Sequence, residues 1–189
     1  MGEHTPSLQA FLAELQQSGG AGPGRAPPPV ERWNPPDCGD AGIEILADGT
    51  WRHEGARMTR ESLVRLFASI LRKDADGVTY LVTPVEKVRV RVEDAPFTAV
   101  RADRLGQGEA QKIVLTTNVG DQVVIGPERP LRVEIGLDGA PRPYALVRGR
   151  LEARILRAPF YEIVDWAEAR PDGRLRLTSD GAAFDLGAL

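Results

Sequence analysis

The chain is 189 residues long, and its 24 lysines and arginines are outnumbered by 27 aspartates and glutamates, for a formal net charge of −3 at pH 7. This balance excludes broad, non-specific binding to nucleic acid, which needs a basic excess. The single cysteine, Cys38, excludes an intramolecular disulfide and is typical of a reducing compartment. The sequence carries neither an apolar run of membrane-spanning length nor the layout of a secretion signal. We therefore expect a cytoplasmic protein with no nucleic-acid or membrane partner, built as one medium or two small domains.

Residues 1–42 are expected to form a short helix followed by a linker. Thr5-Pro6 places an N-cap residue before a proline at the first helical position, a pattern that begins helices. The apolar residues that follow recur at helical spacing: Leu8, Phe11, Leu12 and Leu15. From Ser18 to Pro36 glycine and proline are frequent, which predicts a linker, and Trp33 is expected to pack the end of this linker against the protein.

Residues 43–95 have the pattern of a first α+β unit. Asp48-Gly49 predicts a hairpin turn between strands over 43–47 and 50–53. Thr59 is a suitable cap for a helix that should extend to about Arg72-Lys73. The apolar face of that helix would comprise Leu63, Val64, Leu66, Phe67, Ile70 and Leu71. Beyond it, valines at 88, 90 and 92 alternate with basic residues, as in a half-buried antiparallel strand.

Residues 96–189 are predicted to form a β-meander and a second α+β unit. Three strands are expected over 97–101, 112–116 and 122–125. A regular alternation of apolar and charged residues then predicts one long strand over 147–155. Pro159 opens a helical pattern whose apolar positions include Phe160 and Ile163, and a final hairpin closes the chain.

A weak internal sequence similarity suggests that the two α+β units are copies of one motif. Residues 43–49 (IEILADG) are answered by residues 133–139 (VEIGLDG), and the apolar positions stay in phase further along if six residues are inserted into the second copy. The alternative is a chance match, because Asp-Gly is a common turn dipeptide. We expect an α+β fold of two small domains, built from repeated β-β-α-β-β-like motifs with mostly antiparallel sheets.

No catalytic, metal or cofactor motif is visible in the sequence. His4 and His53 are far apart and the one cysteine has no ligand spacing around it, so no structural zinc site is predicted. Adjacent carboxylates at Glu93-Asp94 would point to opposite faces of a strand. Gly106-Gln107-Gly108 lacks the third glycine of a dinucleotide loop and is expected to be a turn. We predict no catalytic residue, no metal ligand and no cofactor.

Two basic strand faces are the predicted ligand-binding residues. Lys87, Arg89 and Arg91 lie at i, i+2 spacing on one predicted strand, and Arg148, Arg150 and Arg154 lie at similar spacing on another. Side chains at this spacing share one face, so they could bind a small anionic ligand or an acidic protein partner. We place the contacts at Arg148 and Arg150 first, and at Lys87 and Arg89 next. The alternative is that both faces are solvated surface, with nearby carboxylates neutralising the charge.

Six segments of the chain together resemble a bacterial family known as domain of unknown function 1285. They are Asp48-Gly49-Thr50-Trp51, residues 63–67 (LVRLF), residues 80–88 (YLVTPVEKV), residues 93–97 (EDAPF), residues 117–121 (TNVGD) and residues 148–153 (RGRLEA). They are distributed over most of residues 43–189, and the linker at residues 18–36 lies outside the match.

The resemblance implies a cytoplasmic bacterial protein with a two-domain α+β fold of repeated motifs and a suggested part in signal transduction. It brings no catalytic residues. Two function classes follow: a noncatalytic module that binds a ligand or partner, or an enzyme of unknown type that uses a cleft between the units. The scarcity of histidine and cysteine and the absence of a nucleophile motif favour the first class. The sequence predicts no oligomeric state.

Overall fold

The computed structural model describes residues 28–188 and divides into two compact units between Asp94 and Ala95. The predicted helix at residues 5–17 and most of the predicted linker lie outside the described residues. Residues 28–42, also assigned to that linker, contain a 3-10 turn and the start of a strand in the first unit. Within the described part, no helix is both long and apolar enough to cross a membrane.

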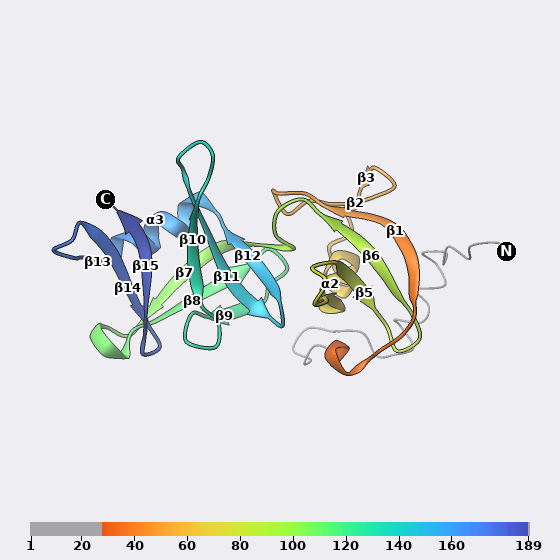
Figure 1. Cartoon of the computed structure of the whole chain (residues 1–189), viewed down its shortest axis with the longest axis horizontal. Helices are drawn as coiled ribbons and strands as arrows, with labels where there is room; N and C mark the ends of the chain where they lie inside the picture. The colour runs from red at the N-terminus through yellow and green to blue at the C-terminus, as the bar shows by residue number, and fades with distance from the viewer. Residues whose placement is uncertain (1–27, 189) are drawn as a thin grey trace. The chain divides into compact units, whose positions relative to one another are not determined.

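The first unit is a six-stranded mixed sheet with one α-helix (Figure 1). Its elements are η1 (Val30–Arg32), β1 (Asp37–Ile45), β2 (Trp51–His53), β3 (Ala56–Arg57), α2 (Glu61–Ser69), β4 (Leu71–Lys73), β5 (Thr79–Val82) and β6 (Lys87–Val92). The strand order is β3-β2-β1-β6-β5-β4, and within it only the central β1–β6 pair is parallel.

Helix α2 buries Phe67 in the core of the first unit, where its ring stacks on Trp51 at a centroid distance of 6.4 Å. The helix is shorter than predicted. It ends at Ser69, and Leu71 to Lys73 form β4, because Leu71 pairs with Leu81 of β5 and joins the ladder. The predicted cap at Thr59 is also wrong, since Arg60 holds the N-cap position without a side-chain bond.

The second unit contains a six-stranded sheet, a helix and a separate three-stranded sheet. Its elements are β7 (Phe97–Leu105), η2 (Gly108–Ala110), β8 (Lys112–Thr117), β9 (Gln122–Val124), β10 (Leu131–Ile135), β11 (Pro141–Arg148), β12 (Leu151–Ile155), α3 (Arg157–Asp165), β13 (Glu168–Ala169), β14 (Arg174–Ser179) and β15 (Ala182–Ala188). The strand orders are β10-β11-β12-β7-β8-β9 and β13-β14-β15. Ile163 of α3 and Leu177 of β14 are fully buried in the core of this unit.

The long strand predicted over 147–155 is in fact two strands. β11 ends at Arg148 and β12 begins at Leu151, and these two residues pair across the turn. Gly149 in this turn has a φ of 52°, a left-handed conformation that glycine adopts without steric cost. The alternation of apolar and charged residues continues through the turn, so periodicity alone does not reveal the turn.

The two-domain organisation is as predicted, and each unit is mostly β-sheet with one α-helix in its described part, but the proposed β-β-α-β-β repeat is not confirmed. The two large sheets share a strand order. Each consists of two consecutive three-stranded meanders, and the first strand of the first meander lies parallel to the last strand of the second. The two similar segments do not lie at equivalent strands of this order. Residues 43–49 contain the end of β1, the first strand of its unit, whereas residues 133–139 contain the end of β10, the fourth strand of its unit. The helices also differ in place, since α2 precedes β4 and α3 follows β12.

Candidate functional site

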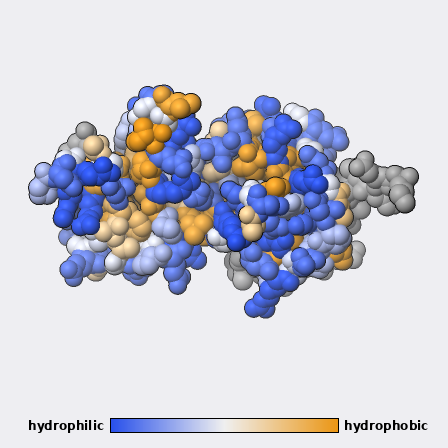
Figure 2. Space-filling view, in the orientation of Figure 1, coloured by the Kyte–Doolittle hydropathy of each residue, from blue (hydrophilic) through white to orange (hydrophobic). Residues whose placement is uncertain are grey.

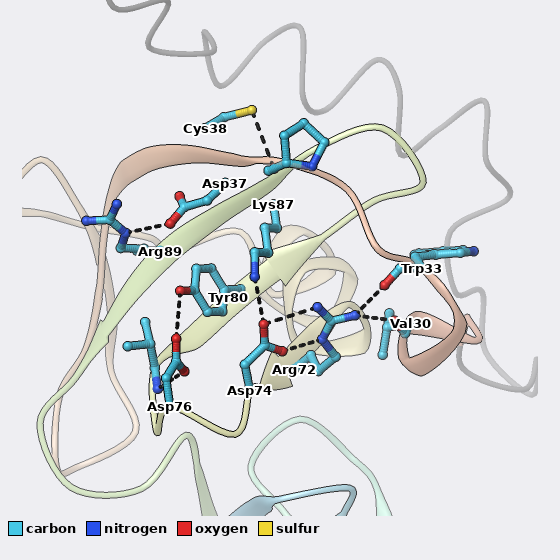
Figure 3. A network of polar contacts seen from close by, with 12 residues as sticks. Val30, Trp33, Asp37, Cys38, Arg72, Asp74, Asp76, Tyr80, Lys87 and Arg89 are labelled. Carbon is cyan, nitrogen blue, oxygen red and sulfur yellow. Dashed lines mark hydrogen bonds and ion pairs between the residues drawn. The ribbon is translucent and has the colours of Figure 1, made fainter.

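The predicted basic face of the first unit exists on β6, and its cations are paired with carboxylates (Figure 3). Lys87 Nζ lies 2.7 Å from Asp74 Oδ2 and 4.2 Å from the centroid of the Tyr80 ring. Arg89 Nε lies 3.0 Å from Asp37 Oδ2. Arg91, the third member, lies 3.6 Å from a carboxylate oxygen of Glu44. A ligand at this face would therefore compete with carboxylates of the protein itself.

Asp74 is the centre of this polar network. Burial would raise the pKa of its carboxyl group, but hydrogen bonds from Arg72 and Lys87, together with their charges, outweigh burial and lower the pKa below its usual value. The same bond to Asp74 raises the pKa of the Lys87 ammonium group. Both shifts favour the charged pair, so the network has the electrostatics of a structural ion cluster.

Arg72 connects this cluster to the segment before β1 (Figure 3). Its side chain is buried, and its guanidinium Nη1 donates hydrogen bonds of 2.7 Å to the backbone carbonyls of Val30 and Trp33. Its Nε donates to Asp74 at 2.6 Å. Sequence analysis placed Arg72 at a helix end; its position in β4 gives it a packing role that holds residues 30–33 against the sheet.

Arg148 and Arg150 do not share a strand face. Arg148 is the last residue of β11, where its Nη1 lies 2.6 Å from Asp121 Oδ2 and its guanidinium stacks 5.0 Å from the centroid of the Phe97 ring. Arg150 is exposed in the turn that follows. The i, i+2 geometry that made this pair attractive as an anion site is therefore absent.

The remaining candidates of the sequence analysis have local structural roles. Glu93 accepts a hydrogen bond of 2.8 Å from the backbone N–H of Ala47. The Gly106-Gln107-Gly108 segment is a turn, as expected, and leads into η2. His53 ends β2. Among residues 28–188, no group of three or more histidine, cysteine, aspartate or glutamate side chains is placed to hold a metal ion.

A cavity of about 420 Å³ in the second unit is the best candidate site. One wall is the end of β7 and the η2 turn, and the other comprises the end of α3 and the β13–β15 sheet. Its lining combines three arginines, two glutamates, a tryptophan and a buried glutamine: Arg104, Arg170, Arg176, Glu109, Glu168, Trp166 and Gln111. Figure 2 shows mainly hydrophilic residues on the visible surface over β13 and β14.

The three arginines of this cavity differ from three other arginines of the same unit. Arg101, Arg132 and Arg174 each lie within ion-pair distance of a carboxylate. Among the residues that the structure describes, Arg104, Arg170 and Arg176 make no such pair, although two glutamates line the same cavity. Glu168 and Arg176 are even direct cross-strand neighbours, a position from which ion pairs commonly form. Arg176 also faces Asp185 across β14 and β15, and its charge helps to lower the pKa of that carboxyl group without a hydrogen bond between the two side chains. The guanidinium donors of the three arginines can therefore bond to a ligand.

The floor of the cavity is fixed by buried hydrogen bonds. The side-chain amide of Gln111 donates to the carbonyl of Thr178 at 2.6 Å, and the backbone N–H of Asp180 donates to the carbonyl of Gln111 at 2.8 Å. Next to them, the Ser179 hydroxyl accepts from Ile113 N–H and donates to the Ile125 carbonyl. Because Gln111 and Ser179 are buried and bonded, the floor is pre-organised.

Sequence analysis missed this site because its residues have no common spacing. Arg104, Trp166 and Arg176 come from separate elements. Glu168 and Arg176 become neighbours only through the antiparallel pairing of β13 with β14. A weak signal was present in residues 166–170, where tryptophan, glutamate and arginine alternate with alanine.

Two family models match almost all of the described chain. The model described as "Domain of unknown function (DUF1285), N-terminal domain" matches residues 28–95, and that described as "Protein of unknown function (DUF1285), C-terminal domain" matches residues 96–186. The chain belongs to the DUF1285 family. None of the curated proteins matches it.

Crystal structures of two DUF1285 proteins are similar to this chain. The protein from Silicibacter pomeroyi DSS-3 is 43% identical, with a TM-score of 0.85, and the match covers 95% of each chain. The protein from Shewanella baltica OS155 is 29% identical, with a TM-score of 0.52, over 66% of this chain and 91% of its own. These matches support the family assignment and assign no activity.

Proposed function

We propose that this DUF1285 protein is a noncatalytic binding module that takes a small anionic molecule in the cavity of its second unit. The observation that carries the proposal is the set of three guanidinium groups, at Arg104, Arg170 and Arg176, that line one cavity and make no ion pair within 4 Å among residues 28–188. Arginine donors bind carboxylate and phosphate groups in directed, often bidentate pairs. The cavity volume lies within the range of roughly 300–1,000 Å³ that small-molecule sites have.

The chemistry of the lining favours binding over catalysis. It contains no histidine and no cysteine, the residue types that most often transfer protons or attack substrates near neutral pH. Glu109 and Glu168 are exposed carboxylates. An enzyme that relies on these two carboxylates is the alternative. A role in signal transduction would follow from ligand binding if the bound state were recognised by a partner.

The basic residues Arg148, Arg150, Lys87 and Arg89 are a second candidate location, for a small anion or an acidic partner. Arg150 and Arg89 are exposed and could contact such a partner directly. The carboxylates that already bond to Lys87, Arg89 and Arg148 weigh against this location. The two locations can be separated by one titration experiment.

The test is isothermal titration calorimetry with four anions that differ in charge and organic part: pyrophosphate, citrate, glucose phosphate and adenosine monophosphate. We expect at least one to bind with a Kd below about 1 mM at low salt, and more weakly as salt rises. The double substitution Arg170→Gln with Arg176→Gln should weaken binding about tenfold or more. The double substitution Arg148→Gln with Arg150→Gln is the matched control.

Each outcome decides between the locations. Binding that is lost in the cavity variant and kept in the control supports the cavity. The reverse result places the site at Arg148 and Arg150. If none of the four anions binds the parent protein, the proposed function is wrong. Circular dichroism of both double variants establishes that the fold is kept.

A further inference from the structure

We infer that the ligand of the cavity is a nucleoside phosphate, an inference that rests on the proposed function and narrows it to one chemical class. The observation behind it is the order of side chains along one wall. Trp166 is followed by Glu168 and then by Arg170, and all three line the cavity. An aromatic ring, a carboxylate and a guanidinium group in this order match the base, the sugar and the phosphate of a nucleotide.

The spacing within this wall suits the match. Glu168 lies in β13 and Arg170 follows two residues later, so their Cα atoms are separated by roughly 6–7 Å if the backbone stays extended. Arg176 is the cross-strand neighbour of Glu168 on β14, and Arg104 lies on the opposite wall. A phosphate group near Arg170 could thus receive donors from more than one element, while the sugar lies near Glu168.

Trp166 supplies a surface for the base. It is the C-cap residue of α3, is half-buried and lines the cavity. Any of the nucleobases can stack on an aromatic side chain, because each base has a π-face. A ligand with an anionic group but no ring would leave this surface unused.

Gln111 supplies polar contacts for the base edge. Its side chain is almost completely buried, and one N–H of its amide donates to the Thr178 carbonyl. Among the described residues its amide makes no other hydrogen bond, so a second N–H and the carbonyl oxygen retain bonding capacity. A buried amide with spare donor and acceptor capacity is suited to the mixed donors and acceptors of a base edge.

The two carboxylates argue against a bare anion. Glu109 and Glu168 lower the net charge of the lining from three positive to one positive, and they would repel a ligand that consists of phosphate alone. A sugar hydroxyl group turns the same carboxylates into favourable acceptors, as in dinucleotide sites where an acidic residue binds the ribose. A nucleoside phosphate offers a phosphate group to the arginines and sugar hydroxyl groups to the glutamates.

The test is calorimetry of the full chain with adenosine monophosphate, adenosine and ribose phosphate. We expect adenosine monophosphate to bind at least about tenfold more tightly than either fragment. Trp166→Leu should weaken adenosine monophosphate about tenfold and leave ribose phosphate within about twofold. Trp33→Leu, which changes a tryptophan of the other unit, is the matched control. Indole fluorescence should be quenched by the nucleotide in the parent and in the control, and not in Trp166→Leu.

A second variant keeps the inference testable if Trp166→Leu fails to fold. Glu168→Ala changes an exposed residue and should weaken adenosine monophosphate more than pyrophosphate. If ribose phosphate binds the parent as tightly as adenosine monophosphate, or if neither variant changes the nucleotide affinity, the nucleotide class is wrong while anion binding stands. If neither pyrophosphate, citrate nor any phosphate ester binds the parent, the proposed function itself has failed.

Discussion

The side-chain amide of Gln111 donates a 2.6 Å hydrogen bond to the backbone carbonyl of Thr178, 67 residues further along the chain. This bond joins the segment after η2 to β14, and both residues line the cavity. Gln111 is 4% exposed, so water has little access to its amide, whereas Thr178 is half-buried. The bond therefore contributes to the stability of the second unit and to the position of both cavity walls.

Replacing Gln111 by alanine should destabilise the protein by about 0.5–1.5 kcal/mol, because the hydrogen bond between its buried amide and the half-buried carbonyl of Thr178 would be lost. Urea unfolding followed by circular dichroism measures this change. Gln107→Ala is the control: its side chain is exposed in the same turn and caps nothing, so its effect should stay within about 0.5 kcal/mol. Equal effects of both substitutions would show that the Gln111 bond does not fix the turn.

Asp74→Asn should remove an acid-sensitive contribution to stability. The folded pKa of Asp74 is lowered, mainly because the bonds from Arg72 and Lys87 outweigh burial, whereas the unfolded pKa of aspartate is about 3.9. A lowered folded pKa means that the contribution is complete above the unfolded value and is lost as the pH falls through about 4 toward the folded value. We expect a loss of about 1.5–3 kcal/mol in Asp74→Asn at neutral pH, from weaker bonds to two cations.

The pH dependence separates this effect from simple misfolding. Urea midpoints of the parent and Asp74→Asn should differ most near neutral pH and converge below about pH 4, as the parent carboxylate is protonated. Glu61→Gln is the control, since this exposed glutamate makes a surface pair with Arg65 that contributes little. A stability difference that stays constant with pH would contradict the assigned role of Asp74.

Local patterns predicted much of the fold, and boundaries set by long-range pairing were predicted poorly. The alternation at 87–92 corresponds to β6, and the Asp48-Gly49 turn lies where the sequence placed it. Helix α2 was predicted too long because Ile70 and Leu71 continue its apolar face, while the pairing of Leu71 with Leu81 is a tertiary choice that periodicity does not contain. The turn at Gly149 was missed for a similar reason, since alternation continues through it.

The cavity was beyond prediction from the sequence because its residues are assembled by topology. Glu168 faces Arg176 through the pairing of β13 with β14, and Gln111 reaches this sheet across 67 residues. Basic strand patterns drew attention to Lys87 and Arg89 instead, yet the sequence did not reveal that Asp74 and Asp37 lie beside them. Charge patterns along one strand identify cations, and the fold decides which of them are neutralised.

The core of each unit gives a further prediction. Phe67 and Ile163 are fully buried, one in α2 and one in α3. Phe67→Ala should cost about 3–5 kcal/mol, and Ile163→Ala about 2–5 kcal/mol, through lost burial and a cavity. Urea melts measure both, with Glu162→Ala on the exposed side of α3 as a control expected to change stability by about 0.5 kcal/mol or less. A parent-like melt for either core variant would contradict the described packing.

The turn that forms one wall of the cavity contains two glycines with different requirements. Gly106 and Gly108 have φ values of 71° and 60°, but a Cβ atom at Gly106 would lie 2.8 Å from the carbonyl oxygen of Ala110, whereas one at Gly108 meets nothing within 4 Å. Gly108→Ala should therefore cost about 1–2 kcal/mol, for the left-handed backbone alone. Gly106→Ala should cost at least about 1 kcal/mol more, because backbone must move to relieve the contact.

Urea melts compare the two variants directly, and the displaced turn should also weaken adenosine monophosphate binding in Gly106→Ala more than in Gly108→Ala. Equal stabilities would mean that the turn shifts freely, and it could then not serve as a pre-organised wall of the site.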